Sequence, residues 1–330
     1  EQQMGDGAAT HRVNMFGLDV ANTSSTEALD WIVERVNRGH QSVVNFVNAH
    51  CCNVAARDTA YYRALRQSDR LLPDGSGVRM AMRFQGVELR ENLNGTDLFP
   101  ALCERTVREN LSLFLLGAAP GVAADVAANM TRRFPGLQVA GTHHGFFDQA
   151  QEPEVIRQIN ASGADILLVA MGVPTQEKWL IENRDALNTK VNMGVGGLFD
   201  FYAERISRAP LKLRQLGLEW TWRLLQEPGR MWRRYLIGNP EFLVRARLDA
   251  RRARRQERAA AELRRKPASA MARRTRWWLA TRSKPLAKRA LDILLSGTAL
   301  LFASPLFLLT AAAIRLESPG PVFFSQQRVG

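Results

Sequence analysis

The chain has 330 residues, of which 46% are hydrophobic and 23% are charged, and its formal net charge is +13. This composition excludes a disordered or fibrous protein, and the length is enough for one large core or for two domains. The charge is uneven, because residues 1–204 carry 18 basic and 24 acidic side chains, whereas residues 245–289 carry 17 basic and 3 acidic ones. A domain of ordinary charge is therefore followed by a strongly basic segment.

The first residues and the cysteines bear on the compartment. Residues 1–11 are polar and contain no apolar run like that of a secretory signal, so we expect a disordered segment or the start of a fragment. Cys51, Cys52 and Cys103 form a small, odd set, which favours a reducing compartment over a disulfide framework. No Cys-x-x-Cys pair or second histidine cluster completes four ligands around them, so we predict no metal site.

Residues 12–204 alternate short apolar runs with amphipathic, helix-like stretches. The runs cover residues 42–47, 71–72, 112–116, 138–140, 166–171 and 191–195, and the helix-like stretches include residues 122–134 and 153–161. Continuous apolar runs are typical of buried parallel strands. We therefore predict an α/β domain with a mostly parallel, Rossmann-like sheet and flanking helices, whose ligand site lies beyond the carboxyl ends of the strands.

Polar or glycine-bearing turns follow five of these runs. They read Asn48-Ala49-His50, Pro73-Asp74-Gly75-Ser76-Gly77, Gly117-Ala118-Ala119-Pro120-Gly121, Gly172-Val173-Pro174-Thr175-Gln176-Glu177 and Gly194-Val195-Gly196-Gly197. Small residues let backbone N–H groups approach an anion, and a helix that begins just beyond them favours phosphate. The turns predict a nucleotide or sugar-phosphate pocket, with ordinary turn chemistry as the alternative.

Three common cofactor and metal motifs are absent from the sequence. They are G-x-G-x-x-G after the first strand, the P-loop G-x-x-x-x-G-K-[ST], and an Asp-x-Asp pair. Their absence argues against a dinucleotide-dependent dehydrogenase and a P-loop NTPase, and we predict no cofactor. Without an Asp-x-Asp pair to hold a divalent metal, the charge on a leaving diphosphate would be met by cationic side chains, backbone N–H groups and helix dipoles.

Seven short motifs occur in order between residues 12 and 244. They are Asn48-Ala49-His50, Pro73-Asp74-Gly75-Ser76-Gly77, Gly95-Thr96-Asp97-Leu98, Gly141-Thr142-His143-His144-Gly145, Gly172-x-Pro174-x-Gln176-Glu177, Gly194-Val195-Gly196-Gly197-x-x-Asp200, and Arg208-Ala209-Pro210 followed by Gly217-Leu218-Glu219-Trp220. As a set they resemble the WecG/TagA/CpsF glycosyltransferases, glycosyltransferase family 26. The resemblance implies an inverting, metal-independent transfer of a hexose or N-acetylhexosamine-type sugar. The donor would be a UDP-sugar and the acceptor a polyprenyl-diphosphate-linked sugar, at the cytoplasmic face of the bacterial inner membrane, in surface or exopolysaccharide synthesis.

The same resemblance implies roles for single residues. Asp74 matches the catalytic base, which takes the proton of the acceptor hydroxyl and contributes about 10²–10⁴ in rate. On its own motif, Asp74 could equally be a turn residue, Asn48 a helix cap and Gln176 a surface amide. The substrate-binding residues that the resemblance implies are Asn48, Thr96, Asp97, Gln176, Gly194, Gly196, Gly197, Asp200, Arg223, Arg230 and Arg233.

Two positions depart from the family pattern. Phe46 stands where the family often has Thr, and Asn92 stands where it often has Arg. We therefore expect contacts with the donor to differ here, and the sugar specificity of relatives is not transferred to this chain.

Residues 205–244 form a basic, aromatic-rich appendage. Their pattern predicts a helix over residues 211–226 that stops near Pro228-Gly229 and a second short helix after it. The family resemblance implies that this appendage closes over the active site at the membrane, with Arg223, Arg230 and Arg233 facing the pocket. Arginine suits a diphosphate because it is always charged and binds in a bidentate way. A solvated basic helix face is the alternative.

Residues 245–283 predict a polybasic linker or helix. Because an apolar stretch follows directly, we favour an anionic membrane surface over nucleic acid as its partner. Residues 293–314 carry no charge and are long enough to cross a bilayer as a helix. Ser304-Pro305 interrupts them, which leaves a kinked span or a re-entrant hairpin open, and basic residues on both flanks favour the hairpin.

Residues 284–330 carry a second set of motifs. They are Lys288-Arg289-x-x-Asp292, Ser304-Pro305, Glu317-Ser318-Pro319-Gly320-Pro321-Val322-Phe323-Phe324 and Gln327-Arg328-Val329-Gly330. They resemble the start of the bacterial sugar transferases, which are polyprenyl-phosphate phosphoglycosyltransferases with a re-entrant apolar segment and later catalytic residues. Two alternative functions stay open: a phosphoglycosyltransferase fragment whose first domain only binds nucleotide, and a membrane-tethered scaffold for polysaccharide assembly. A homo-oligomer is also open.

Overall fold

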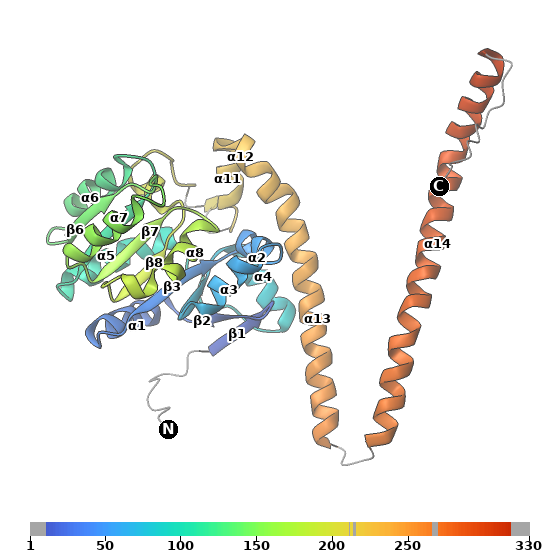
Figure 1. Ribbon diagram of the computed structural model, residues 1–330, viewed down its shortest axis with the longest axis horizontal. Helices are drawn as coiled ribbons and strands as arrows, with labels where there is room; N and C mark the ends of the chain where they lie inside the picture. The colour runs from blue at the N-terminus through green and yellow to red at the C-terminus, as the bar shows by residue number, and fades with distance from the viewer. Residues whose placement is uncertain (1–10, 211, 214–215, 266–269, 318–330) are drawn as a thin grey trace. The chain divides into compact units, whose positions relative to one another are not determined.

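The computed structural model describes residues 11–210, 212–213, 216–265 and 270–317 (Figure 1). The chain divides into two compact units, Glu1–Arg258 and Ala259–Gly330. The division falls within the segment predicted as a polybasic linker. The domain boundaries expected from the sequence remain predictions.

The first unit is built on an eight-stranded sheet with the order β1-β2-β4-β3-β8-β7-β5-β6. The pairings among β2 to β8 are parallel, and only β1 and β2 pair antiparallel in this sheet. The predicted α/β fold class is therefore confirmed. The strands are β1 His11–Met15, β2 Leu18–Asn22, β3 Ser42–Val47, β4 Arg70–Pro73, β5 Ser112–Gly117, β6 Gln138–His143, β7 Ile166–Ala170 and β8 Val191–Gly194.

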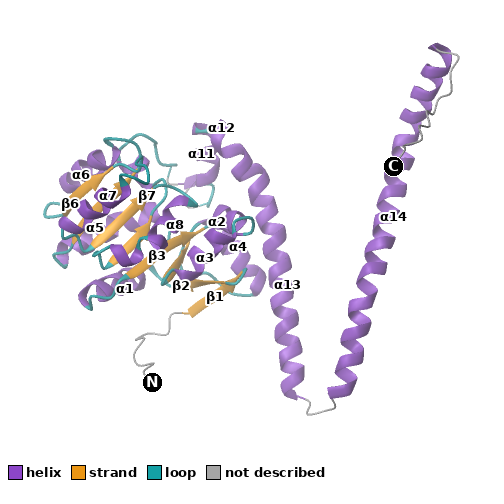
Figure 2. Ribbon diagram, in the orientation of Figure 1, coloured by secondary structure: helices purple, strands orange, loops and turns teal. Residues whose placement is uncertain are grey.

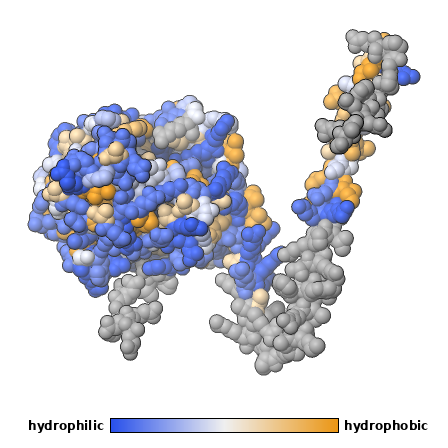
Figure 3. Space-filling model, in the orientation of Figure 1, coloured by the Kyte–Doolittle hydropathy of each residue, from blue (hydrophilic) through white to orange (hydrophobic). Residues whose placement is uncertain are grey.

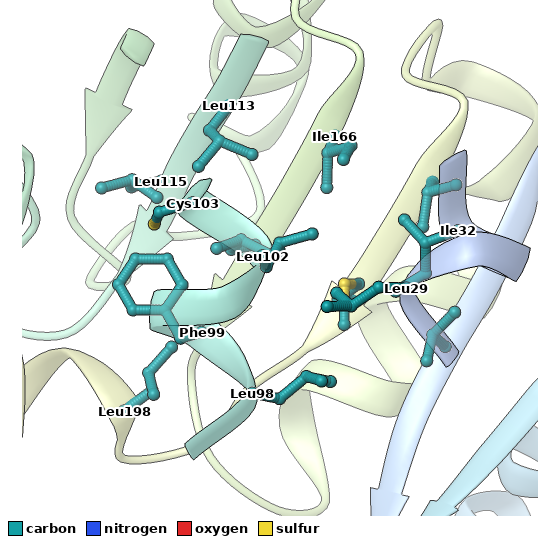
Figure 4. Close-up of a cluster of buried hydrophobic side chains, with 14 of the residues drawn as sticks. Leu29, Ile32, Leu98, Phe99, Leu102, Cys103, Leu113, Leu115, Ile166 and Leu198 are labelled. Atoms are coloured by element: carbon teal, nitrogen blue, oxygen red, sulfur yellow. The ribbon is translucent and has the colours of Figure 1, made fainter. Parts of the chain in front are cut away.

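Helices pack on both faces of the sheet (Figure 2). Along β5, Leu113 and Leu115 belong to one buried cluster while Phe114 and Leu116 belong to another, as the two-residue period of a strand requires. Figure 4 shows the first cluster, in which side chains of α1 and α5 meet those of the strands. The helices are α1 Ser25–Asn37, α2 Ala49–Ala55, α3 Thr59–Gln67, α4 Gly75–Gln85, α5 Gly95–Arg108, α6 Val122–Arg133, α7 Glu152–Ala161, α8 Thr175–Glu182 and α9 Leu198–Tyr202.

The strand order brings four of the predicted turns together. Strands β4, β3, β8 and β7 are consecutive neighbours in the sheet and run parallel. The turns that follow them therefore meet at one edge, which is where ligands bind in open parallel sheets. These are the turns that begin at Asp74, Asn48, Val195 and Met171.

The basic appendage consists of short helices rather than one long one. Helix α11 spans Glu219–Gln226, α12 spans Pro228–Trp232, and a π-helical turn, η2, spans Arg233–Ile237. The predicted helix over residues 211–226 is wrong in extent, because Gly217 has φ +71° and a turn interrupts the helix before α11. Residues 211, 214 and 215 of that prediction lie outside the described residues.

Helix α13, Gly238–Arg265, fastens the appendage to the sheet domain. Phe242, Ala246 and Ala250 recur every four residues and are buried, which is the spacing of one helix face. Phe242 and Ala246 join the buried cluster that contains α2, α3 and α4. The backbone N–H of Phe16 donates to Asp249 Oδ2 at 2.9 Å, and Arg57 pairs with Glu241 at 2.6 Å.

Helix α14, Ala270–Glu317, is continuous through Ser304-Pro305. Its stretch Leu291–Leu316 is 26 residues long and apolar enough to cross a membrane, and Figure 3 shows hydrophobic residues over its described part. Pro305 has no N–H to bond the carbonyl of Leu301, and the hydroxyl of Ser304 donates to that carbonyl at 2.7 Å instead. The helix is therefore unbroken at this point, and the choice between a kinked span and a re-entrant hairpin in the bilayer stays a prediction. The motif residues after Glu317 lie outside the described residues.

Candidate active site

Asp74 and Asn48 meet at the ends of neighbouring strands. Val47 of β3 is in register with Pro73 of β4, so the residues that follow these two strands lie side by side. The Nδ2 of Asn48 donates to Oδ2 of Asp74 at 3.0 Å, while its Oδ1 accepts the backbone N–H of Cys51 at 3.1 Å. Asn48 is thus the cap of α2, as one alternative held, and the same amide also holds Asp74.

The environment of Asp74 acts on its pKa in opposite directions. Burial raises the pKa of Asp74, while the hydrogen bond from Asn48 and the charges of Arg234 and Arg223 lower it. Asp74 stands at the first cap position of α4 but makes no side-chain cap hydrogen bond. The carboxylate is therefore held by another side chain, and a raised pKa makes it a stronger base.

Asn92 shapes the turn behind Asp74. Its Oδ1 accepts the backbone N–H of Gly75 at 2.6 Å, and Gly75 has φ +90°, a conformation that glycine adopts without strain. At the position where the family often has Arg, this chain therefore has an amide that fixes the backbone next to the candidate base.

Gln176 joins two of the turns. It is only 3% exposed, so the surface-amide alternative is wrong. Its Oε1 accepts the N–H groups of Gly172 at 3.2 Å and Gly196 at 2.9 Å, and its Nε2 donates to Oε1 of Glu177 at 3.0 Å. These contacts tie the turn after β7 to the turn after β8. Contact between Gln176 and a substrate stays a prediction.

Gly194 leaves room for this arrangement. A Cβ atom at residue 194 would lie 2.3 Å from Oδ1 of Asn45 and 2.9 Å from Nε2 of Gln176. Both distances are shorter than real contacts, so a larger residue would displace one of these buried amides.

Glu177 is a residue that the sequence analysis did not single out. It is fully buried next to Gln176, and burial raises the pKa of Glu177 to about 7. It immediately follows Gln176 in the motif, and nothing in the sequence distinguishes it from a solvated glutamate at the start of a helix. Its burial comes from the packing of α8 onto the sheet.

We expect Glu177→Gln to change how stability depends on pH. Folded Glu177 keeps its proton up to about pH 7, whereas in the unfolded chain it loses the proton near the ordinary value of 4.5. Its contribution to stability is therefore complete below pH 4.5 and is lost as the pH rises to about 7, by on the order of 3 kcal/mol. Urea unfolding of both proteins across this range should show a flatter pH dependence for Glu177→Gln. Equal slopes would contradict a protonated Glu177.

The predicted residues around α5 and α9 form a second group. Oδ2 of Asp97 accepts a hydrogen bond from Nδ2 of Asn94 at 2.7 Å, and Oδ1 of Asp97 forms an ion pair with Arg208 at 2.7 Å. The backbone carbonyl of Thr96 accepts the hydroxyl of Tyr202 at 2.6 Å. Arg208 belongs to the Arg-Ala-Pro motif, so this ion pair connects the appendage to the Gly-Thr-Asp motif.

Arg223 reaches the turn after β8. A Cβ atom on Gly197 would lie 3.5 Å from Nη2 of Arg223 and 3.9 Å from Oδ2 of Asp200. The guanidinium also lies over the ring of Phe201, 5.2 Å from its centroid. The structure thus brings Gly197, Asp200 and Arg223 together, and the charge of Arg223 acts on Asp74.

The second cation near Asp74 is Arg234, which the sequence analysis missed. Arg234 is partly buried and lowers the pKa of Asp74. Burial and, secondarily, the charge of Arg234 lower the pKa of His50 to about 4. The predicted Arg233 is exposed and lies 5.2 Å from the ring of its neighbour Trp232. Arg230 lies on α12, but its side chain is outside the described part of the structure.

Comparison with known proteins decides the family. The family model described as "Glycosyl transferase WecG/TagA/CpsF family" matches residues 13–257. The chain belongs to this family. It is a glycosyltransferase, and the predicted resemblance is confirmed. A second family model, "Bacterial sugar transferase", matches residues 283–330, where the second resemblance was stated.

Two curated relatives carry the same name, N-acetylglucosaminyldiphosphoundecaprenol N-acetyl-beta-D-mannosaminyltransferase. The protein from Bacillus subtilis (strain 168) is 31% identical over 223 residues, which are 67% of this chain and 86% of the relative. The protein from Bacillus spizizenii (strain W23) is 36% identical over 190 residues, which are 58% of this chain and 72% of the relative.

Within the part of the chain that the structure describes, no three His, Cys, Asp or Glu side chains are grouped as a metal site would need. The positive charges of Arg234 and Arg223 act on Asp74. Cationic side chains on the appendage are thus placed to meet negative charge beside the candidate base.

Proposed function

We propose that this chain transfers a hexose or N-acetylhexosamine-type sugar from a UDP-sugar to a polyprenyl-diphosphate-linked sugar, with inversion and without a metal. The observation that carries the proposal is the placement of Asp74 among four phosphate-compatible turns, held by Asn48 and facing the charges of Arg223 and Arg234. The names of the two relatives, which act on a diphosphoundecaprenol-linked sugar, support the acceptor class.

In this mechanism an oxygen of the acceptor sugar attacks the anomeric carbon of the donor. The bond from that carbon to the diphosphate oxygen breaks, and UDP leaves with the electron pair. Asp74 takes the proton of the attacking hydroxyl. Arg223, Arg230, Arg233 and Arg234, with the turn formed by Gly194, Gly196 and Gly197, stabilise the charge that grows on UDP.

Asn48, Thr96, Asp97, Gln176 and Asp200 complete the proposed pocket. Asn48 orients the base directly. Gln176 keeps two of the turns in place through its bonds to Gly172 and Gly196. Thr96 and Asp97 lie where Arg208 and Tyr202 join α5 to the later part of the chain.

We also propose that the enzyme works at the cytoplasmic face of the inner membrane. A polyprenyl-linked acceptor is confined to a bilayer, and the helix stretch Leu291–Leu316 is apolar enough to enter one. The basic segment before it would attract an anionic leaflet by about 1 kcal/mol per basic residue near the surface.

A second candidate function rests on residues 283–330. The match to bacterial sugar transferases favours a phosphoglycosyltransferase that loads bare polyprenyl phosphate. In that case the sheet domain would only bind nucleotide.

One assay separates these functions. The full chain in detergent would be incubated with a panel of radiolabelled UDP-sugars and either an N-acetylglucosaminyl-diphosphate lipid or bare polyprenyl phosphate. We expect product only with the sugar-bearing lipid. Product with bare polyprenyl phosphate alone would support the second function, and failure with every pair would favour a scaffold.

A further inference from the structure

A groove lined by arginines lies between the end of α4 and the middle of α13. The cavity measures about 230 Å³, and its lining residues are Arg83, Phe84, Arg247, Ala250, Arg251 and Arg254. Arg254 Nη2 donates to the carbonyl of Phe84 at 2.6 Å, and the guanidinium of Arg247 lies 5.9 Å from the centroid of the Phe84 ring. We call this cavity the arginine groove.

The arginine groove gathers positive charge without an acidic partner in its lining. Helix α4 contains no acidic residue. On α13, Glu241 is paired with Arg57 and Asp249 accepts the N–H of Phe16, so both described carboxylates bind elsewhere. Cations that converge repel one another, and a bound anion relieves that repulsion.

We propose that the arginine groove binds the phosphate of an anionic phospholipid headgroup. Guanidinium groups bind phosphate through paired, charge-assisted hydrogen bonds. Arg83, Arg247 and Arg251 are exposed and supply such groups from two helices. Phe84, partly buried between them, gives the cavity an apolar wall.

The neighbouring surface of α13 favours a lipid over a free anion. Val244 and Leu248 are 61% and 46% exposed, and they follow each other at the four-residue spacing of a helix face. Arg247 and Arg251 have the same spacing beside them. Figure 3 shows hydrophobic and hydrophilic residues next to each other along this helix. Such a surface suits the boundary between headgroups and acyl chains.

The location also suits an enzyme whose acceptor is lipid-linked. Helix α4 begins directly after Asp74 and ends at Gln85, beside Arg83. Its 11 residues make a length of about 16 Å. A headgroup in the groove would therefore lie about one short helix away from the candidate base. The groove itself does not depend on the catalytic role of Asp74.

Hydrogen exchange of the full chain would test the groove. The protein would be placed in neutral detergent micelles doped with phosphatidylglycerol or with phosphatidylcholine. We expect added protection in α4 and in the middle of α13 with phosphatidylglycerol only. Equal protection by both lipids, or by inorganic phosphate alone, would overturn the proposal of an anionic headgroup site.

A triple variant with a matched control sharpens the test. Arg83→Gln, Arg247→Gln and Arg251→Gln together should weaken phosphatidylglycerol binding about 100-fold, since each arginine changes affinity about fivefold. Arg254 is kept because it bonds Phe84. The control combines Arg63→Gln, Arg66→Gln and Arg132→Gln, which are exposed on α3 and α6. An equal loss in the control would show general charge attraction and overturn the proposal.

Sugar transfer to a detergent-solubilised acceptor distinguishes this proposal from the proposed function. The groove variant should keep that activity, because none of its three residues contacts the site around Asp74. Loss of lipid protection with intact transfer supports the groove. Lipid protection that persists in the groove variant overturns it, whatever the transferase result.

Discussion

Asp74→Asn is expected to lower kcat by about 100-fold or more while UDP-sugar binding stays near its normal level. Asparagine keeps the shape of the side chain but cannot take the proton of the acceptor hydroxyl. The amide of Asn48 already donates to Oδ2 of Asp74, and the substituted amide can rotate to present its own oxygen to that donor. The pocket should therefore persist while the base is lost. Steady-state transfer rates and calorimetric binding of the donor measure the two effects.

Asp30→Asn is the matched control for this variant. Asp30 is half-exposed on α1, a helix that takes no part in the proposed pocket, and it pairs with Arg105 of α5. Asp30→Asn removes one negative charge, as Asp74→Asn does, but away from the pocket. Its kcat should therefore stay within a factor of two or so of the wild type. Unchanged turnover in Asp74→Asn would remove Asp74 from the role of base. Loss of donor binding together with turnover would instead indicate a structural role.

The sheet could be predicted because buried parallel strands leave a local signature. The runs that form β3, β5, β7 and β8 are mostly apolar rather than alternating, and a glycine or an amide stands at or just after the end of each. The β1–β2 hairpin was not predicted, since its short strands mix polar and apolar residues. Its turn relies on positive φ at Phe16 and Gly17. A non-glycine residue in that conformation has no clear sequence signal.

The sequence indicated which residues belong to the candidate site but not which of their side chains contact one another. Asn48 and Asp74 are 26 positions apart, and only the pairing of β3 with β4 puts them together. Gln176 looked like a group that faces substrate, yet its oxygen already accepts two backbone N–H groups. Side-chain direction depends on packing, which a single sequence does not record.

The direction of the arginine side chains in the appendage could not be predicted from the sequence either. Arg233 and Arg234 are adjacent, so they point in different directions from the same helical turn. A π-helical turn begins at Arg233, and such turns shift the register of the residues beyond them. The family pattern indicated Arg233, whereas the larger of the two cationic effects on the pKa of Asp74 comes from Arg234.

We expect Arg234→Ala to lower kcat/KM by about 100-fold, the usual cost of removing one group that stabilises developing negative charge. It should also move the acid limb of the pH–rate profile. The positive charge of Arg234 lowers the pKa of Asp74, so its removal raises that pKa further. A base must be deprotonated to act, and activity would therefore begin to fall at a higher pH than in the wild type.

Two further arginine variants make this result specific. Arg223→Ala should move the acid limb in the same direction but by less, because Arg223 has the smaller of the two effects on the pKa of Asp74. Arg233→Ala should move the limb less than Arg234→Ala does, since the guanidinium of Arg233 is exposed beside the ring of Trp232, whereas the charge of Arg234 is the larger of the two cationic effects on the pKa of Asp74. If the acid limb of Arg234→Ala stays at the wild-type pH, both the role of Asp74 as the base and the effect of Arg234 on its pKa would be contradicted. A shift in Arg234→Ala that Arg233→Ala reproduces would reflect the net charge of the appendage rather than contact at the site.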